Sequence, residues 1–305
     1  MNWIKTAVIL FACLMALPAR AGDIPMIDAH SQLPTPGTAD DLIGLLDQAG
    51  ISQVILSFRG SAKLKHVIPL VRKHPDRVTG AAKIKGRHWN EGNDKFYKNV
   101  AKQMDTGAIG AIGEALLYHA AKGSKAPEYR VTSSDKQFKF VLDLARDKGW
   151  PLITHIEFRA VPERGEFMAM LGSILTDNRD VAFPLIHMAQ LDPPEAARLI
   201  AAHPNVYFMT SHSNTITTSK SKQPWTNMFD GDQLKADWRD LMTNHPERFI
   251  LNFDNVWPEH WSSSYVEQAD LWRKTLATFP ADAAHLIAHE NAERLWKLTP
   301  LGRQN

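Results

Sequence analysis

The sequence has little cysteine and almost no net charge, and each shortage excludes a class of protein. Cys13 is the only cysteine among the 305 residues, and it lies in the apolar segment at the start of the chain. With a single cysteine the chain forms neither an internal disulfide nor a multi-cysteine metal site. The 35 Lys and Arg residues are nearly balanced by 33 Asp and Glu residues. Because proteins that bind nucleic acid usually carry a strongly basic surface, no nucleic-acid partner is expected.

The first 21 residues have the pattern of an export signal. Lys5 precedes an apolar run over residues 7–17, and Ala19-Arg20-Ala21 fits a small-x-small cleavage site. We expect cleavage after this tripeptide and a periplasmic or secreted mature domain over residues 22–305; lipid attachment at Cys13 is the weaker alternative. Cleavage leaves 33 basic and 33 acidic residues. No later apolar run reaches membrane-spanning length, so no membrane anchor is expected in the mature chain.

Apolar runs typical of strands alternate with amphipathic helical patterns along the rest of the chain. The strand candidates are residues 24–31, 53–58, 78–84, 108–117, 151–158, 182–189, 206–212 and 249–256. Helical patterns include residues 40–50, 94–106, 135–149, 193–203 and 234–244, with Asp40 and Asp135 as expected N-caps and Gly50 and Gly149 as expected C-caps. This alternation, without a break in composition, predicts a single-domain α/β chain, a (β/α)8 TIM barrel. A doubly wound open sheet is the alternative fold.

Two long connections, residues 118–134 and 213–232, follow the fourth and seventh strand candidates. Barrels carry their active-site loops at these strand ends. The second connection contains Trp225 and is interpreted either as a surface loop or as a wall of a binding site. The glycines at 107, 110 and 113 do not have the spacing of a dinucleotide-binding loop, and we expect them to allow close packing of neighbouring strands.

Polar side chains interrupt the apolar strands near their C-terminal ends. They are His30, Glu114, His155, His187 and Asp254, in the first, fourth, fifth, sixth and eighth strand candidates. A single such residue is more often structural, but the strand ends of a closed barrel converge on one mouth. Imidazoles and carboxylates together are the ligand set of Zn²⁺ and similar divalent ions. The five residues therefore predict one shared metal site.

Cations also lie near the predicted strand ends. Arg59 follows the second strand, and Lys83 lies in the third on the same face as Lys85. Arg59 and Lys83 are candidate substrate-binding residues, and His212 at the end of the seventh strand is a further candidate contact. Cations around a barrel mouth suit a small substrate that carries a carboxylate or a phosphate.

Taken in order, the motifs resemble those of the amidohydrolase superfamily, particularly its amidohydrolase-related (type 2) branch. They are Ile27-Asp28-Ala29-His30, Thr154-His155, Leu185-Ile186-His187, Phe253-Asp254 and Glu290-Asn291-Ala292-Glu293-Arg294-Leu295-Trp296. Gly113-Glu114 is similar to the fourth-strand motif of the TatD-like branch. The resemblance covers essentially the whole mature chain. It implies a TIM barrel in which His30, His155, His187 and Asp254 are metal ligands and Glu114 is a further ligand.

One position departs from the family pattern, because Gln32 stands where the family has a second histidine. Strand alternation places Asp28, His30 and Gln32 on one face. An amide oxygen is a weaker ligand for Zn²⁺ than an imidazole, which makes Gln32 a doubtful ligand. Three outcomes stay open: Glu114 compensates, the site takes a harder ion, or the site holds no metal. A divalent cofactor, Zn²⁺ as one or two ions, is expected in the first case.

These observations favour a metal-dependent hydrolase acting on a small anionic ester, lactone, amide or phosphate, with Asp254 exchanging protons with water and leaving group. The chain lacks the G-x-S-x-G motif of serine hydrolases and the phosphate-binding P-loop. Two alternatives stay open: a non-oxidative decarboxylase, an activity that the type 2 branch includes, and a catalytically inactive ligand-binding barrel. The sequence leaves the substrate, the number of ions and the oligomeric state open, a homo-oligomer included.

Overall fold

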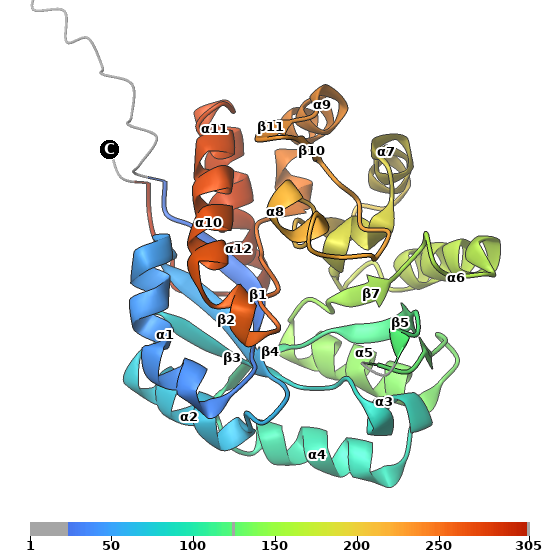
Figure 1. The fold of residues 1–305 in the computed structure, drawn as a ribbon. Coiled ribbons are helices and arrows are strands. Elements are labelled where there is room, and N and C mark those ends of the chain that lie inside the picture. Colours follow the sequence, from blue (N-terminus) through green and yellow to red (C-terminus); the bar gives the residue numbers. More distant parts are fainter. Residues whose placement is uncertain (1–23, 124–125, 304–305) are drawn as a thin grey trace, which may run out of the picture.

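The computed structural model describes residues 24–123 and 126–303 (Figure 1). The expected export signal and its cleavage site lie outside these residues. Within the described ranges, no helix combines the length and the apolar character needed to cross a membrane.

Eight strand positions, counted over the described residues, form the wall of a barrel. They are β1 (Ile27–Leu33), β2 (Gln53–Phe58), β3 (Val78–Ala82), β4 (Ile109–Ile112) continued by β5 (Ala115–His119), β7 (Thr154–Ile156), β8 (Phe183–Leu185), β9 (Val206–Met209) and β12 (Phe249–Ile250). Each lies within or overlaps a predicted strand, and β2 has the predicted bounds. Several are shorter than predicted, because the apolar runs continue past the paired residues into the loops at the barrel mouth.

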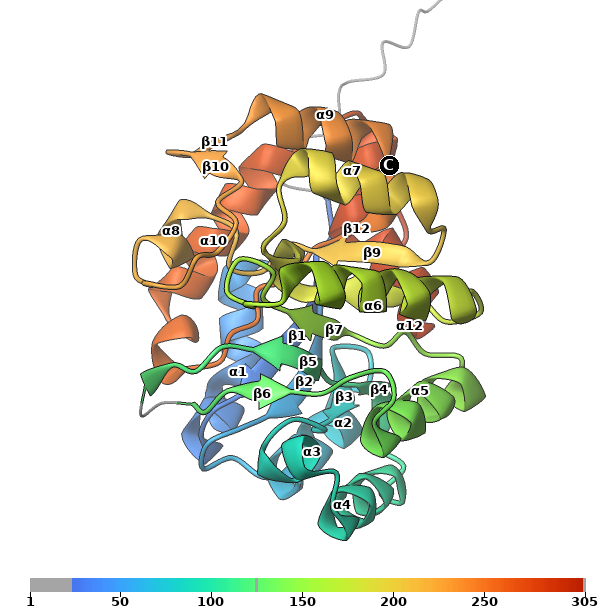
Figure 2. The same cartoon turned by 90° about the vertical axis from the view of Figure 1, so that its right-hand side faces the viewer.

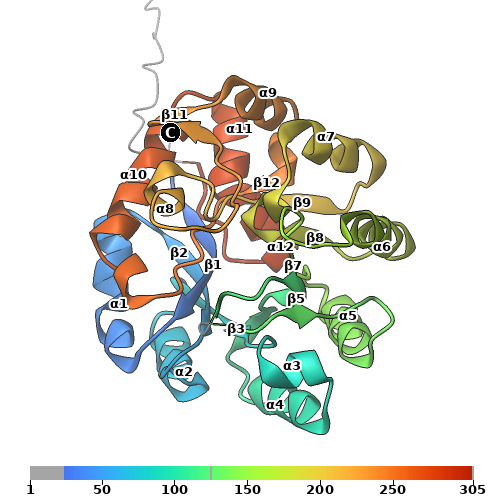
Figure 3. The ribbon, with the colours of Figure 1, turned by 45° about the vertical axis from the view of Figure 1, so that its right-hand side comes forward.

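The strands pair in parallel and in chain order, in two runs that join to form a ring. β1, β2, β3 and β4 form one run, and β5, β7, β8, β9 and β12 form the other. Backbone hydrogen bonds join the runs where the chain returns to its first strand: Ala29 N–H donates to the Leu251 carbonyl at 3.2 Å, and Asp254 N–H donates to the His30 carbonyl at 2.9 Å. Because β4 continues into β5, the ring is closed (Figure 3). The predicted TIM barrel is confirmed, and the open sheet is excluded.

Helices surround the strands on the outside. The longer ones are α1 (Pro36–Ala49), α2 (Leu64–Lys73), α4 (Asp94–Met104), α5 (Lys136–Lys148), α6 (Arg164–Asp177), α7 (Pro193–Ala202), α9 (Ala236–Asn244) and α10 (Ser263–Leu276). Shorter ones are α3 (Arg87–Glu91), α8 (Thr215–Thr218), α11 (Ala281–His285) and α12 (Asn291–Trp296). α6, α7 and α9 lie next to one another along one flank (Figure 2). The long connections contain a short strand β6 (Tyr129–Arg130), which pairs with β5, and the strand β10 (Phe229–Asp230), which pairs with β11 (Gln233–Leu234).

The ends of two helices show which local signals were decisive. Gly50 ends α1 and Gly149 ends α5, both with a left-handed φ of 63°, as predicted. The prediction that Asp40 caps the first helix is wrong, because α1 begins one turn earlier. Thr35 is its N-cap and accepts a hydrogen bond from Thr38 N–H at 3.3 Å. Proline at the first helical position is preorganised for the helix, which favours this earlier start.

The core consists of two apolar layers separated by the barrel wall. The inner layer fills the barrel with residues of nearly every strand, including Ile27, Ala29, Ile55, Ala81, Ala111, Ile153, Ile186, Met209 and Ile250, and Trp296 of α12 packs against it. The outer layer lies between strands and helices and includes Phe183 and Phe208. Strand alternation assigns neighbouring residues to the two layers. The packed interior leaves the polar side chains only the mouth of the barrel.

The three glycines around β4 have different roles. A Cβ on Gly113 would lie 2.8 Å from the Ala82 carbonyl oxygen, and one on Gly110 would lie 2.9 Å from a methyl group of Thr79. These two glycines permit the close packing of β3 against β4, as predicted. Gly107 does not, because its Cβ position has no atom within 4 Å. Its left-handed φ of 67° places it in the turn that follows α4.

Candidate metal centre

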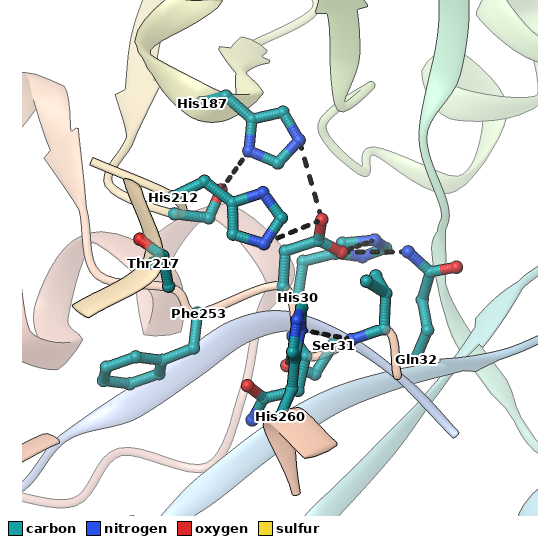
Figure 4. A network of polar contacts seen from close by, with 12 residues as sticks. His30, Ser31, Gln32, His187, His212, Thr217, Phe253 and His260 are labelled. Atoms are coloured by element: carbon teal, nitrogen blue, oxygen red, sulfur yellow. Dashed lines mark hydrogen bonds and ion pairs between the residues drawn. The ribbon is translucent and has the colours of Figure 1, made fainter. Parts of the chain in front are cut away.

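The five residues predicted to share a metal site lie together at the mouth of the barrel. Each is at most 4 % exposed: His30, Glu114, His155, His187 and Asp254. They come from β1, from the junction of β4 and β5, from β7, and from the loops after β8 and β12. Figure 4 shows the imidazoles of His30, His187 and His212 around a common centre.

A bulge in β1 positions His30 and corrects one expectation. Asp28 pairs with Val54 and Ser31 with Leu56, so that two residues of β1 lie opposite one residue of β2. Ala29 packs inside the barrel, and His30 reaches the mouth. Asp28 does not share this face, contrary to simple alternation. Its carboxylate accepts hydrogen bonds from Ser31 Oγ at 2.6 Å and from the Tyr265 hydroxyl of α10 at 3.1 Å.

Glu114 and Asp254 lie in the middle of the site, and each directs its two carboxylate oxygens to opposite sides. Glu114 Oε1 and Asp254 Oδ1 face the first side, and Glu114 Oε2 and Asp254 Oδ2 face the second side. The Nε2 of His30 lies 3.2 Å from Glu114 Oε1 and 3.7 Å from Asp254 Oδ1. The amide of Gln32 donates to the same two oxygens, at 3.0 and 2.9 Å. The ammonium of Lys85 forms an ion pair with Glu114 Oε1.

The second side presents imidazole nitrogens to the other two carboxylate oxygens. His155 Nδ1 lies 3.0 Å from Glu114 Oε2, and His187 Nε2 lies 3.5 Å from Asp254 Oδ2. His212 stacks on His187 with ring centroids 4.6 Å apart, and its Nε2 lies 3.9 Å from Asp254 Oδ2. One nitrogen or oxygen atom each from Glu114, His155 and His187 lies within 4.8 Å of the others, and the same holds for His187, His212 and Asp254. On the first side it holds for His30, Glu114 and Asp254.

Two residues orient the imidazoles of this second side. Glu157 Oε1 lies 3.3 Å from His155 Nε2, and the Ser211 hydroxyl lies 2.9 Å from His187 Nδ1. Burial would lower the pKa of His155, but its hydrogen bonds with Glu114 and Glu157 raise it above the ordinary value. A cation bound on this side would take the place of the proton between His155 and Glu114. Such support of the outer nitrogen is the usual arrangement around a metal-binding histidine.

The electrostatics of the second side also suit a cation. Burial lowers the pKa of His187 well below its ordinary value, and the neighbouring His212 lowers it further, so the ring is neutral. Burial likewise lowers the pKa of His212 to about 4. Burial raises the pKa of Asp254, and the negative charge of Glu114 raises it further. Burial alone would raise the pKa of Glu114, but Lys85 and the histidines hold it well below its ordinary value.

Three of the site residues hold a backbone conformation that is unusual for residues other than glycine. The φ angles are 57° at His187, 53° at His212 and 48° at Asp254. His187 begins a turn of four left-handed residues that ends at Gln190. Conformations of this kind cost free energy and cluster at functional sites, where packing enforces them. Here they aim side chains from three loops into the mouth.

Several buried polar atoms of the site have no hydrogen-bond partner among the described residues. They are His30 Nδ1, both ring nitrogens of His212 and Gln32 Oε1. Burying a polar atom without a partner costs free energy, so such atoms indicate water or a ligand. The unpartnered nitrogens of His212, beside two carboxylates and two oriented imidazoles, fit a divalent metal ion on the second side.

The predicted substrate-binding cations lie around this centre. The Arg59 guanidinium stacks on Trp257, 3.9 Å from the ring centroid. Burial lowers the pKa of Arg59 against the opposing influence of the site carboxylates. Lys83 forms no ion pair with the residues described; its ammonium lies 5.6 Å from the centroid of the Phe58 ring. Burial lowers the pKa of Lys83, and neighbouring cations lower it further. It is Lys85, two residues later, that contacts the carboxylate.

The sequence matches no protein-family model and no curated protein. It is similar to solved structures. A TIM-barrel protein from Bordetella bronchiseptica is 17% identical, with a TM-score of 0.59 over 90% of this chain and 99% of that one. A Burkholderia multivorans amidohydrolase with bound Zn is 15% identical, with a TM-score of 0.55 over 90% of this chain and 100% of that one. Dihydroorotase from Saccharomyces cerevisiae is 11% identical, with a TM-score of 0.55 over 90% and 84%.

The chain has the same barrel fold as these proteins. The fold expected from the family resemblance is therefore confirmed, and identities of this size show the fold alone.

Two residues of this mouth, Glu157 and Ser211, were not expected from the sequence, whereas a wall of the site was one of the two interpretations of the second long connection. Glu157 lies two residues after His155, so strand alternation was a usable signal for it. Trp225, in the second long connection, packs against His187 and His212 with ring centroids 4.7 and 5.3 Å apart. This connection thus forms one wall of the site. Ser211 offered no comparable signal, because its contact with His187 depends on the left-handed turn.

Proposed function

We propose that this chain is a metal-dependent hydrolase of the amidohydrolase superfamily, acting on a small anionic ester, lactone, amide or phosphate. The observation that carries the proposal is the second side of the site. There, His155 and His187 are each supported at one ring nitrogen and present the other to Glu114 and Asp254. The similarity to an amidohydrolase with bound Zn supports Zn²⁺ as the ion.

The ion would be held on the second side, where two adjoining groups share His187: Glu114 with His155 and His187, and Asp254 with His187 and His212. When bound, a divalent ion supplies Lewis acidity towards water and towards a carbonyl or phosphoryl oxygen of the substrate. The remaining chemistry belongs to the protein. Glu157 and Ser211 hold the two imidazoles in place, and Trp225 covers one flank of the site.

Asp254 is the residue proposed to move the proton. Its Oδ1 accepts a hydrogen bond from the Gln32 amide at 2.9 Å. Its Oδ2 faces His187 on the second side. The raised pKa of Asp254, caused by burial and by Glu114, makes it a stronger base than an exposed carboxylate. Asp254 is thus suited to take a proton from the attacking water and return it to the leaving group.

An anionic substrate is proposed because cations outnumber free anions around the mouth. Lys85 is paired with Glu114, whereas Arg59 stacks on Trp257 and Lys83 has no carboxylate partner among the described residues. A substrate carboxylate or phosphate would give Arg59 and Lys83 a directly paired counter-ion. His212, with two unpartnered nitrogens, is a further proposed contact.

The test combines metal analysis with a substrate panel. Protein purified without an affinity-tag metal is analysed for bound elements, stripped with a chelator and reloaded with Zn²⁺. Each preparation is assayed with matched neutral and carboxylate-bearing esters, lactones, amides and phosphate esters. We expect hydrolysis that is lost on stripping, restored on reloading and faster with the anionic member of each pair. Protein that contains no metal and hydrolyses nothing would instead support the ligand-binding barrel, and CO₂ release from a carboxylic acid would identify a decarboxylase.

Export is a separate proposal, supported by the pattern of the first 21 residues. Mass spectrometry of protein recovered from the periplasm or the medium should place Gly22 at the N-terminus. An intact terminus, or a lipid on Cys13, would refute cleavage after Ala21.

A further inference from the structure

We infer that the site takes one divalent ion, on the side of His155 and His187, and that Gln32 and Lys85 replace a second ion on the side of His30. The inference rests on the proposed function, since it counts the ions of the same site. Gln32 is then a hydrogen-bond donor that, together with Lys85, takes the place of a metal ion. It is not a weakened metal ligand.

The first argument is the direction of the hydrogen bonds. The amide nitrogen of Gln32 lies 3.0 Å from Glu114 Oε1 and 2.9 Å from Asp254 Oδ1. Two carboxylate oxygens can only accept, so they fix the amide with its NH₂ group towards them. An NH₂ group has no lone pair for a metal. It also occupies the position between the two carboxylates where a shared ion would bind.

His30 follows the same pattern. Its Nε2 lies 3.2 Å from Glu114 Oε1 and 3.7 Å from Asp254 Oδ1, the two oxygens that bind Gln32. Its Nδ1 is buried and has no partner among the described residues. Facing two carboxylate oxygens, which only accept, Nε2 is the donor of this contact. His30 therefore acts on the first side as a hydrogen-bond donor.

The second argument is charge. The ammonium of Lys85 pairs with Glu114 Oε1, and the two side chains are 22% and 2% exposed. Glu114 and Asp254 with Lys85 leave one negative charge in the centre, since Glu157 is paired with Lys122 at 2.7 Å. One divalent ion converts this to a single positive charge, which suits an anionic substrate. A second divalent ion would raise the net charge to three positive charges, with the ammonium of Lys85 next to the ion.

The two sides differ in what they present to a cation. On the second side, every group that faces the carboxylates is an imidazole, which becomes a ligand when the nitrogen loses its proton to the medium, and His155 and His187 are each supported at the outer nitrogen. On the first side, His30, Glu114 and Asp254 also lie close enough to hold an ion, but the Gln32 amide and the Lys85 ammonium occupy the same carboxylate oxygens. Neither an amide NH₂ group nor an ammonium offers a lone pair, so the second side suits an ion better.

The experiment measures Zn²⁺ per chain by elemental analysis after loading with excess Zn²⁺ and gel filtration. We expect about one Zn²⁺ per chain in the wild-type protein. The double variant Gln32→His/Lys85→Met supplies an imidazole and removes the ammonium, and its content should rise to about two. Lys83→Met is the matched control, since it removes a nearby lysine that does not contact Glu114, and it should stay at about one.

A second comparison locates the wild-type ion without depending on the double variant. His155→Ala should lose the ion, whereas His30→Ala should keep it. The reverse result would place the ion on the first side and overturn the inference. Mn²⁺-loaded wild-type protein should give the electron paramagnetic resonance signal of isolated ions, because only neighbouring ions couple.

The outcomes separate the inference from the proposed function. Two Zn²⁺ ions per wild-type chain, with metal-dependent hydrolysis, would overturn the inference and leave the proposed function standing. One ion in both the wild type and a folded double variant would refute the roles of Gln32 and Lys85. Wild-type protein that binds no Zn²⁺ and is inactive would overturn both.

Discussion

Glu157 and His155 form a pair in which the carboxylate, 3.3 Å from Nε2, turns the other ring nitrogen towards Glu114. Glu157 is itself fixed by Lys122 at 2.7 Å and by the backbone N–H of Ala120 at 2.8 Å. Burial would raise the pKa of Glu157, but His155 and Lys122 hold it at about 2, so it stays ionised. The pair links the loop after β5 to the proposed metal ligands.

Replacing Glu157 with glutamine should weaken Zn²⁺ binding without removing a ligand. The amide keeps the size of the side chain but loses the charge that orients and polarises His155. Loss of such a supporting group usually lowers metal affinity by about 10–100-fold. A competition titration against a Zn²⁺-binding dye measures this affinity. Glu163→Gln is the control, because Glu163 pairs with Arg130 on the surface. Equal affinities for the two variants would contradict the positioning role of Glu157.

Replacing Asp254 with asparagine should abolish most turnover on any substrate that the panel identifies. The amide cannot accept the proton of the attacking water, and general-base catalysis of this kind contributes about 10²–10⁴-fold in rate. Because Asp254 is also a proposed ligand, Zn²⁺ content and kcat are measured on one preparation. Asp180→Asn, which removes an exposed carboxylate paired with Arg146, is the matched control. Full activity of a metal-loaded Asp254→Asn protein would exclude Asp254 as the base.

Much of the fold was predictable because it depends on local signals. Buried strands appear as short apolar runs, and Gly50 and Gly149 mark helix ends where the backbone is left-handed. The shared position of His30, His155 and His187 followed from the geometry of barrels, in which strand ends converge. These features need only the sequence and a choice of fold.

The rest of the site depends on tertiary structure. The bulge in β1 moves Asp28 away from His30, and no local pattern indicates an extra residue between Asp28 and Ser31. Likewise, alternation places Lys83 and Lys85 on one face, but only the packed structure decides which ammonium reaches Glu114. Strand periodicity thus predicts which residues approach the mouth, and bulges and side-chain packing decide their contacts.

Gly113 should not tolerate a side chain, although its backbone does not require glycine. A Cβ at this position would lie 2.8 Å from the Ala82 carbonyl oxygen, where β3 packs against β4. Gly113→Ala should therefore destabilise the barrel by about 1–3 kcal/mol, the usual cost of overpacking. Gly172→Ala in α6 is the control. Its Cβ has no atom within 4 Å, so the change should stabilise the helix by about 0.5–1 kcal/mol. Denaturant unfolding measures both, and equal shifts would refute the packing argument.

Asp28 should make the free energy of unfolding depend on pH. The carboxylate is completely buried between β1 and α10, and burial raises its pKa from 3.8 to about 6. Between about pH 4 and pH 6 the folded chain therefore keeps a proton that the unfolded chain releases. The free energy of unfolding falls as pH rises through this window. Above the window, Asp28 no longer makes it depend on pH. A shift from 3.8 to about 6 corresponds to a free-energy change on the order of 3 kcal/mol.

Asp28→Asn isolates this contribution. The amide oxygen can still accept the Phe253 N–H, which lies 3.0 Å from the carboxylate, but it has no proton to release. The difference in unfolding free energy, wild type minus variant, should therefore decrease by roughly 2–2.5 kcal/mol between pH 4 and pH 7. Urea titrations of chelator-treated proteins keep proton release by the metal site equal in both. Asp105→Asn, an exposed substitution at the end of α4, should leave the corresponding difference unchanged. A difference that stays constant or grows with pH would show that Asp28 is ionised in the folded protein, held by its bonds to Ser31, Phe253 and Tyr265 in spite of burial.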